Sequence, residues 1–211
     1  MKSIYIVLTK TETALSRIIG VVTNEPYTHS SISLDSSLTK LYTFSRLQPE
    51  KPLPAGFVVE NPCTGYMGLH PDTACEIYEL KVPTVSYNMI KKKILRMSKQ
   101  AESYHYSLLG TLYCMFSIKH KRPNHYFCSQ FIGELLHESG AVRLPKHESL
   151  MHPMDYSYMS ECRLLYHGNI YGLVNYYLHK LNPETTVSTS FPHNIKNQRR
   201  ISIRIPFRRL A

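Results

Sequence analysis

The sequence predicts an α+β domain, because strand-like runs and amphipathic helical segments follow one another along the chain. Residues 4–8 form a short apolar run rich in β-branched side chains, and residues 29–34 alternate polar and apolar side chains, as strands do. Residues 84–103 and 127–136 instead repeat apolar side chains at helical spacing. With 211 residues, of which 43% are hydrophobic and 19% charged, the chain suits one globular domain with a full core.

The first half of the chain is expected to consist mostly of strands and turns. The run at residues 4–8 is followed by a segment with helical spacing from Glu12 to about Val21, which ends at Asn24-Glu25-Pro26. Asp35-Ser36-Ser37 marks the turn of a hairpin. Three further strands are expected at residues 41–45, 56–60 and 74–82.

The hairpin formed by residues 29–45 is expected to carry a polar face around His29. If Ile32 lies opposite Tyr42, then His29 lies opposite Ser45, and side chains directly opposite one another share a face. The other members of this face are Ser31, Ser33 and Thr43. A strand face with a histidine and several hydroxyls is typical of the floor of a site, and the alternative is a half-exposed hairpin that faces solvent.

The second half of the chain is expected to be mostly helical. Residues 84–103 form a long helix, and its lysine run, Lys91-Lys92-Lys93, is expected to be the solvated face. Residues 106–116 are apolar and are expected to pack as an irregular helix. A strand at residues 162–166 and a short helix at residues 171–178 close the domain.

Cys128 is expected at the start of a helix. Phe127, Phe131 and Leu135 form the apolar stripe of this helix, and Gly140 stands where a C-cap glycine belongs. Unpaired N–H groups and the positive end of the helix dipole favour an anion in the first turn, so a thiol there should have a lowered pKa. The alternative is a small core residue that happens to lie near a helix end.

A thiolate nucleophile needs a general base, and His29 is the preferred candidate among the eleven histidines. A strand would hold its ring rigidly, whereas most of the other histidines are expected in loops or near the termini. His125, which precedes Cys128 by three residues, is a competing candidate.

The cysteine count and the charge narrow the class of protein. Five cysteines without a Cys-x-x-Cys pair predict neither a disulfide framework nor a zinc ribbon, so no metal or other cofactor is expected. The net charge is +10, but residues 191–211 account for +6 of it, and the mildly basic remainder does not argue for a nucleic-acid partner. No segment resembles a signal peptide or a membrane span, so a cytoplasmic protein is expected.

A domain boundary is expected at Leu181-Asn182-Pro183. Residues 1–182 then form the folded domain, and residues 183–211 form a basic C-terminal extension. This extension is expected either to be a disordered solubilising tail or to engage an acidic partner or a membrane surface through residues 191–211.

Two short motifs carry a resemblance to a known family. Tyr27-Thr28-His29-Ser30-Ser31-Ile32-Ser33-Leu34-Asp35 is followed, about a hundred residues later, by Tyr126-Phe127-Cys128-Ser129-Gln130-Phe131. Together they resemble the circularly permuted, papain-like cysteine hydrolases of the NlpC superfamily, and most of all the YiiX/YebB-like branch, which is related to the lecithin:retinol acyltransferase group. In ordinary papain-like chains the cysteine precedes the histidine, whereas here the histidine strand comes first. The resemblance covers residues 3–180 approximately and leaves the basic tail unmatched.

The resemblance implies a fold and a set of site residues. It implies a central antiparallel sheet with the nucleophile helix packed on it, Cys128 as the nucleophile and His29 as its base. The group that orients His29 departs from the family pattern, since the hairpin register offers Ser45, which carries no charge, and Glu60 is the alternative. The oxyanion would be bound by the backbone N–H of Cys128 and a neighbour, and Tyr126 is a candidate contributor beside the nucleophile.

The function that follows is a thiol-dependent hydrolase or acyltransferase. His29 would deprotonate Cys128, and the thiolate would attack an amide or ester carbonyl of a small-molecule, peptide or lipid substrate to give a thioester. The alternative is a papain-like binding module without turnover, whose basic tail engages an acidic partner or a membrane surface.

Overall fold

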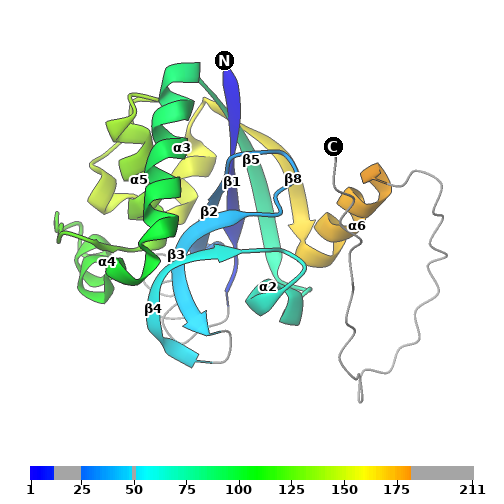
Figure 1. The fold of residues 1–211 in the computed structure, drawn as a ribbon, viewed down its shortest axis with the longest axis horizontal. Helices are drawn as coiled ribbons and strands as arrows, with labels where there is room; N and C mark the ends of the chain where they lie inside the picture. Colours follow the sequence, from blue (N-terminus) through cyan, green and yellow to red (C-terminus); the bar gives the residue numbers. More distant parts are fainter. Residues whose placement is uncertain (12–24, 49–50, 182–211) are drawn as a thin grey trace.

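The computed structural model describes residues 1–11, 25–48 and 51–181, which fold as an α+β domain around one large sheet (Figure 1). The sheet has eight strands in the order β7-β6-β4-β3-β2-β1-β5-β8. Neighbouring strands run antiparallel except β6 and β7, which run parallel. The strands are β1 (Lys2–Thr9), β2 (His29–Ser33), β3 (Leu41–Gln48), β4 (Lys51–Glu60), β5 (Ala74–Val82), β6 (His105–Tyr106), β7 (His125–Tyr126) and β8 (Cys162–Asn169).

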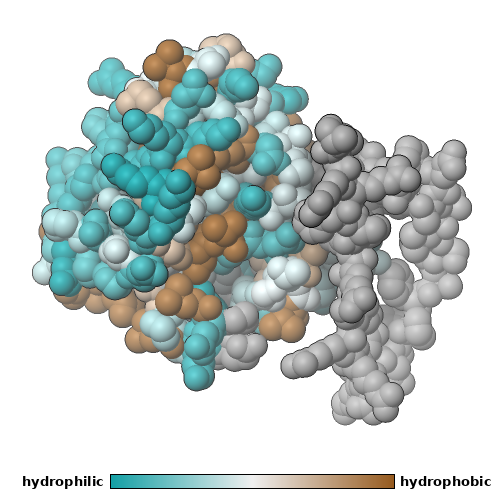
Figure 2. All heavy atoms as spheres, viewed as in Figure 1, coloured by the Kyte–Doolittle hydropathy of each residue, from teal (hydrophilic) through white to brown (hydrophobic). Residues whose placement is uncertain are grey.

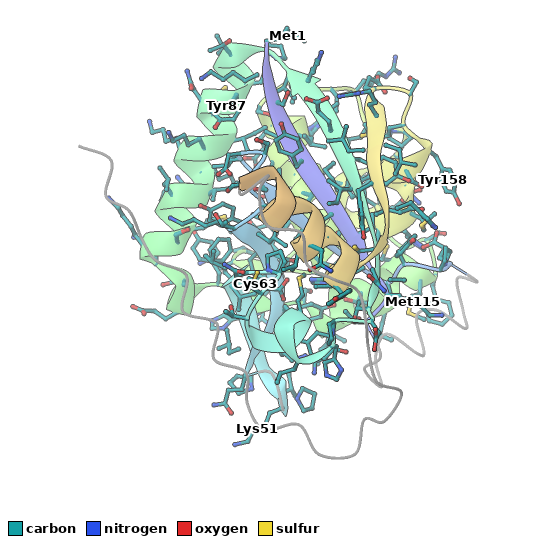
Figure 3. All side chains as sticks on the ribbon, turned by 90° about the vertical axis from the view of Figure 1, so that its right-hand side faces the viewer. Met1, Lys51, Cys63, Tyr87, Met115 and Tyr158 are labelled. Atoms are coloured by element: carbon teal, nitrogen blue, oxygen red, sulfur yellow. The ribbon has the colours of Figure 1, made fainter. Side chains whose placement is uncertain are left out.

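Helices cover both faces of this sheet. α3, α4 and α5 lie on one side, and α2 and α6 lie on the other (Figure 1). Figure 3 views the second side, where α6 lies in front of the strands. The helices are α2 (Gly65–Leu69), α3 (Thr84–Lys99), α4 (Leu108–Met115), α5 (Cys128–Glu138) and α6 (Ile170–Leu181), with short 3-10 turns at Ala101–Ser103, Glu148–Leu150 and Pro153–Tyr158. None of the described helices combines the length and the apolar character needed to cross a membrane.

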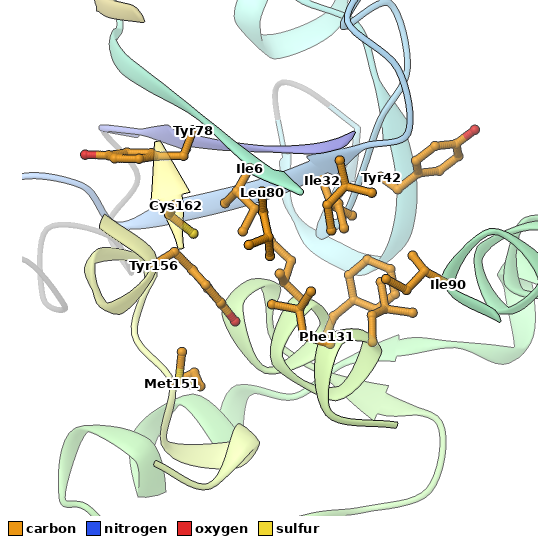
Figure 4. Close-up of a cluster of buried hydrophobic side chains, with 14 of the residues drawn as sticks. Ile6, Ile32, Tyr42, Tyr78, Leu80, Ile90, Phe131, Met151, Tyr156 and Cys162 are labelled. Carbon is orange, nitrogen blue, oxygen red and sulfur yellow. The ribbon is translucent and has the colours of Figure 1, made fainter. Parts of the chain in front are cut away.

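The larger hydrophobic core lies between the sheet and helices α3 and α5 (Figure 4). Ile6, Ile32 and Leu80 project from three adjacent strands toward Ile90 of α3 and Phe131 of α5, and all five side chains are buried. The strand residues share this side because successive side chains of a strand point to opposite faces of the sheet.

The opposite face of the sheet carries a smaller core. Val7 and Ile77 point away from the larger core and pack with Met67 of α2 and with Ile170 and Leu173 of α6. Because both faces are covered, β1 and β5 are buried at most positions and lack the clean polar alternation of a half-exposed strand.

The predicted hairpin register is confirmed, since Ile32 pairs with Tyr42. The hairpin does not face solvent, so that alternative is wrong. β2 lies between β1 and β3 inside the sheet, and every residue from His29 to Ser33 is buried.

Other elements differ from the predicted ranges in length. β3, β4 and β8 are longer than expected, while the predicted helix at residues 84–103 ends at Lys99 and a separate 3-10 turn follows.

The lysine run of α3 is only partly solvated. Lys91 and Lys92 are exposed, as predicted, but Lys93 is largely buried because it pairs with Glu134. α2, β6 and β7 were not expected, and strands of two residues are too short to leave a periodic pattern. The helix expected at residues 12–21 and the extension at residues 183–211 lie outside the described residues.

Candidate active site

Cys128 is the first residue of α5, as the sequence predicts, and only 5% of its surface is exposed. The chain enters the helix from β7 at the edge of the sheet, and Phe127 has an extended backbone that ends the strand. One turn further on, the ring of Phe131 lies 5.3 Å from that of Phe44 on β3 and 5.8 Å from that of Phe57 on β4. This aromatic contact holds the N-terminal turn of α5 over the strands that carry the other site residues.

His29 and the Cys128 thiol lie close enough to shift each other's pKa, raising that of the imidazole and lowering that of the thiol. His29 is the first residue of β2 and is 8% exposed, so a buried strand holds the ring. The competing candidate, His125, instead bonds through Nδ1 with the carbonyl oxygen of Pro123 at 2.8 Å. The structure therefore brings together the two residues on which the sequence prediction depends.

Glu60, the last residue of β4, is the side chain that contacts the other side of the His29 ring. Its Oε2 lies 3.4 Å from Nε2 of His29, and the hydroxyl of Ser31 donates to the same oxygen at 3.4 Å. Because Nε2 contacts the carboxylate, Nδ1 is the ring nitrogen left to exchange a proton with the thiol. The carboxylate also supplies the negative charge that an imidazolium needs.

Ser45 does not make the contact that the hairpin register suggests. Within the described residues its side chain forms no hydrogen bond, and it is half-buried opposite Gly56 of β4. β2 and β3 pair at one position, and beyond it Thr43 Oγ1 donates to the Ser30 carbonyl oxygen at 2.7 Å. The regular strand pairing that would place Ser45 opposite His29 therefore does not extend to the open end of the hairpin. The longer side chain of Glu60 contacts His29 instead.

The surroundings of His29 and Cys128 favour an ion pair. Burial by itself lowers the pKa of His29, but the Glu60 carboxylate and the nearby Cys128 thiol raise it to about 10. Burial raises the pKa of Cys128, yet His29 and the backbone N–H and hydroxyl of Ser30 outweigh this and lower it. Both shifts therefore act in the direction of a thiolate beside an imidazolium.

Ser30 is a site residue that the sequence analysis did not single out. It is fully buried next to His29, and its hydroxyl oxygen has no fixed hydrogen-bond partner within the described part of the chain. Its backbone N–H and its hydroxyl both act to lower the pKa of Cys128 and so favour the thiolate. In the sequence, Ser30 could have been recognised only by its position next to the candidate base His29, on the opposite face of the same strand.

The hydroxyl of Tyr126, the residue predicted to contribute to oxyanion binding, is bonded away from the thiol. It donates to Glu134 Oε1 at 2.9 Å, and the Glu134 carboxylate also binds Lys93 at 2.7 Å and Lys121 at 2.8 Å. This network lies further along α5 than the thiol. Tyr106, the pairing partner of Tyr126 in the parallel β6–β7 ladder, is instead the tyrosine beside Cys128.

A small pocket of about 30 Å³ adjoins the thiol. Its walls are mostly apolar and come from α4, the start of α5 and the segment before the Pro153–Tyr158 turn; they include Tyr106, Thr111, Cys114, Phe127, Met151 and His152. A much larger hollow of about 830 Å³ lies along α3 and α5, on the mainly hydrophilic face seen in Figure 2, and contains none of the residues around Cys128. The small pocket is the one that chemistry at Cys128 would use.

The described residues contain no group of three histidine, cysteine or acidic side chains arranged to bind a metal ion, and the cysteines are all free thiols. No protein-family model and no curated protein matches the chain.

Proposed function

We propose that the protein is a cysteine hydrolase or acyltransferase whose catalytic domain has the permuted papain-like fold of the NlpC superfamily, YiiX/YebB-like branch. The observation that carries the proposal is the position of His29, which lies 3.4 Å from the Glu60 carboxylate through Nε2 and lowers the pKa of the Cys128 thiol. A nucleophilic cysteine needs this succession of thiol, base and orienting group. The order of the two motifs, histidine before cysteine, supports the permuted branch.

The first half of the proposed reaction is acylation of Cys128. The thiolate attacks an amide or ester carbonyl carbon, and the negative charge that develops on the carbonyl oxygen is met by first-turn N–H groups of α5, which have no partner within the helix. The imidazolium of His29 then gives its proton to the leaving amine or alcohol. The bond to the leaving group breaks, and a thioester on Cys128 remains.

The second half of the reaction releases the acyl group. Neutral His29 takes a proton from water or from another nucleophile, which attacks the thioester carbonyl and expels the thiolate. Glu60 stabilises the imidazolium that reforms, because its Oε2 stays in contact with Nε2. Water as the acceptor makes the protein a hydrolase, and an alcohol or amine makes it an acyltransferase.

The decisive experiment measures the reactivity of Cys128 with iodoacetamide, site by site, by mass spectrometry between pH 5 and pH 10. We expect Cys128 to alkylate at neutral pH faster than the exposed Cys63, because only a thiolate is an effective nucleophile. His29→Gln should move the pH midpoint of Cys128 alkylation upward, since the stabilising cation is lost. Cys75→Ser is the matched control and should leave the Cys128 profile unchanged.

Labelling of Cys128 that follows the pH profile of an ordinary thiol, in both the wild-type chain and His29→Gln, would refute the proposal. A second assay uses p-nitrophenyl acetate. Acylation of Cys128 predicts a burst of p-nitrophenolate that matches the protein concentration and an acetyl group on Cys128.

A further inference from the structure

The hollow of about 830 Å³ along α3 and α5, which we call the α3–α5 groove, is lined in part by apolar side chains. Ile90 of α3 and Leu135 of α5 are buried, whereas Met89 and Leu95 of α3 are 48% and 44% exposed. Exposed apolar side chains next to a buried apolar floor offer a partner a surface from which water can be displaced. This feature is unusual on the mainly hydrophilic face of the molecule that Figure 2 shows.

The charged side chains of the α3–α5 groove are nearly all cationic. One of them, Glu138, is acidic, and five are basic: Lys91, Lys92, Lys93, Arg96 and Lys99. Lys93 binds Glu134 and Glu138 at 2.7 Å each, so its charge is compensated. None of the other four forms an ion pair with a residue that the structure describes.

These four cations also repel one another. Lys92 and Arg96 are four residues apart on one helix, and Arg96 and Lys99 are three apart, the spacings at which like charges destabilise a helix. α3 contains no acidic residue that could offset them. An anionic partner along this helix would therefore gain attraction and relieve the repulsion at the same time.

We infer that the α3–α5 groove is a docking site for an acidic amphipathic helix of a partner protein. The α3 residues that line it run from Asn88 to Gln100, which along a helix is a length of about 18 Å, or about three turns. A partner helix of that length would place one apolar stripe against Ile90 and Leu135 and its acidic side chains against the free cations. No residue of the pocket beside Cys128 lines the groove, so the inference is independent of the proposed function.

Three other occupants fit the groove less well. The chain's own residues 191–211 carry six basic residues and no acidic one, so the groove would repel them. Among the described residues that line the groove none is aromatic, whereas sites for single-stranded nucleic acid stack bases on aromatic rings. A helix on a membrane surface inserts apolar side chains that project from it, but Ile90 and Leu135 lie buried between α3 and α5.

The test measures binding of an acidic helical peptide to the full chain by fluorescence anisotropy. The probe is a labelled peptide with two repeats of Glu-Glu-Leu-Leu-Glu-Glu-Leu, and two comparison peptides carry glutamine or lysine in place of every glutamate. We expect saturable binding of the acidic peptide at low salt, and binding about tenfold weaker or less for both comparison peptides. The affinity should fall as NaCl is raised, since salt screens exposed charges.

Matched charge variants locate the site. Lys92→Glu with Arg96→Glu reverses two exposed cations of the groove and should weaken binding about tenfold or more. Lys40→Glu with Lys51→Glu makes the same change in net charge at exposed positions outside the groove, and its affinity should stay within about twofold of wild type. Leu95→Ser should weaken binding about threefold or more, and this loss should persist at high salt because it removes an apolar contact.

Three results would overturn the inference. The first is the absence of saturable binding, or equal binding of the acidic and glutamine peptides. The second is an equal loss in the two double variants, which would show that only the net charge of the chain matters. The third comes from phosphatidylserine vesicles and an oligothymidine probe: if either binds and depends on Lys92 and Arg96 while the acidic peptide does not bind, the groove serves a membrane or a nucleic acid instead. Circular dichroism should verify that every variant remains folded.

Discussion

Cys128 and Cys75 lie on opposite sides of the same sheet, and both are almost completely buried. Cys128 belongs to the side covered by α3 and α5, and Cys75 packs into the smaller core under α2 and α6. Burial raises the pKa of Cys75 to about 12, whereas the pKa of Cys128 is lowered although burial acts on it as well. The comparison shows that the polar partners of a buried thiol, and not its accessibility, decide the direction in which its pKa shifts.

The two thiols have different neighbours because the two cysteines occupy different positions in their secondary-structure elements. Cys75 lies within β5, where its neighbours on the same face are apolar side chains such as Ile77 and Leu173. Cys128 starts a helix that follows β7 and packs against β2, where Ser30 and His29 lower the pKa of its thiol. A helix start packed against a strand end supplies polar groups that a mid-strand position cannot.

The largest expected effect separates the two thiols directly. Cys128→Ala should lower the rate of p-nitrophenyl acetate turnover by about 10⁴-fold or more, because the nucleophile is lost. Cys75→Ser should leave the turnover rate within about twofold of wild type, since no polar partner of the site depends on it. Equal losses for both variants would contradict the assignment, and circular dichroism should verify that both remain folded.

The two cores can be compared through stability. Phe131→Ala removes a fully buried ring that contacts the rings of Phe44 and Phe57, and we expect a loss of about 3–5 kcal/mol in the free energy of unfolding. Ile77→Val in the smaller core should cost about 0.5–1.5 kcal/mol. Urea denaturation measures both values. A smaller loss for Phe131→Ala than for Ile77→Val would contradict the assignment of the main core to the α5 side.

A third experiment compares the two residues that the sequence offered as the orienting group of His29. Glu60→Gln should reduce turnover by about 10²-fold, because it removes the charge that stabilises the imidazolium. Ser45→Ala should change the rate by less than about twofold, since its hydroxyl bonds to nothing within the described residues. The opposite ranking would restore Ser45 as the orienting group.

The smallest expected effect is on the pH dependence of alkylation. Protonated His29 stabilises the Cys128 thiolate, and this stabilisation is present at neutral pH and lost as the pH rises through the pKa of His29, about 10. Glu60→Gln removes a carboxylate that raises this pKa, so the loss should move to lower pH. Site-resolved iodoacetamide kinetics in buffers from pH 7 to pH 11 would detect the shift, and an unchanged profile would show that Glu60 does not act on the ring.

The features of the fold that depend on residues close together in the sequence could be predicted. The start of α5 at Cys128 and the pairing of Ile32 with Tyr42 follow from helical spacing, a turn signal and strand alternation. The contact between His29 and Glu60 could not be ranked above Ser45, because it depends on how β2 and β3 diverge and on the reach of a side chain from β4. Local patterns carry no information on either point.

The residues around the pocket beside Cys128 could not be predicted for the same reason, because local patterns do not show which distant segments meet. Tyr106 and Tyr126 sit in two-residue strands whose parallel pairing has no sequence signature, so nothing indicated which tyrosine would face the thiol. Cys114 and His152 come from two distant segments, and only the folded chain brings them to the pocket beside Cys128. A residue group assembled in this way leaves no spacing that could be recognised.

During synthesis, the strands that carry His29 and Glu60 leave the ribosome well before the helix that carries Cys128. Until α5 packs on β2, the thiol has no imidazole beside it and should behave like any other cysteine. The same packing step covers Ile32 and Phe44, which belong to the main core. Completion of the fold and the lowering of the Cys128 pKa are therefore one event, and under the proposed function an unfinished chain would carry His29 and Glu60 without a nucleophile.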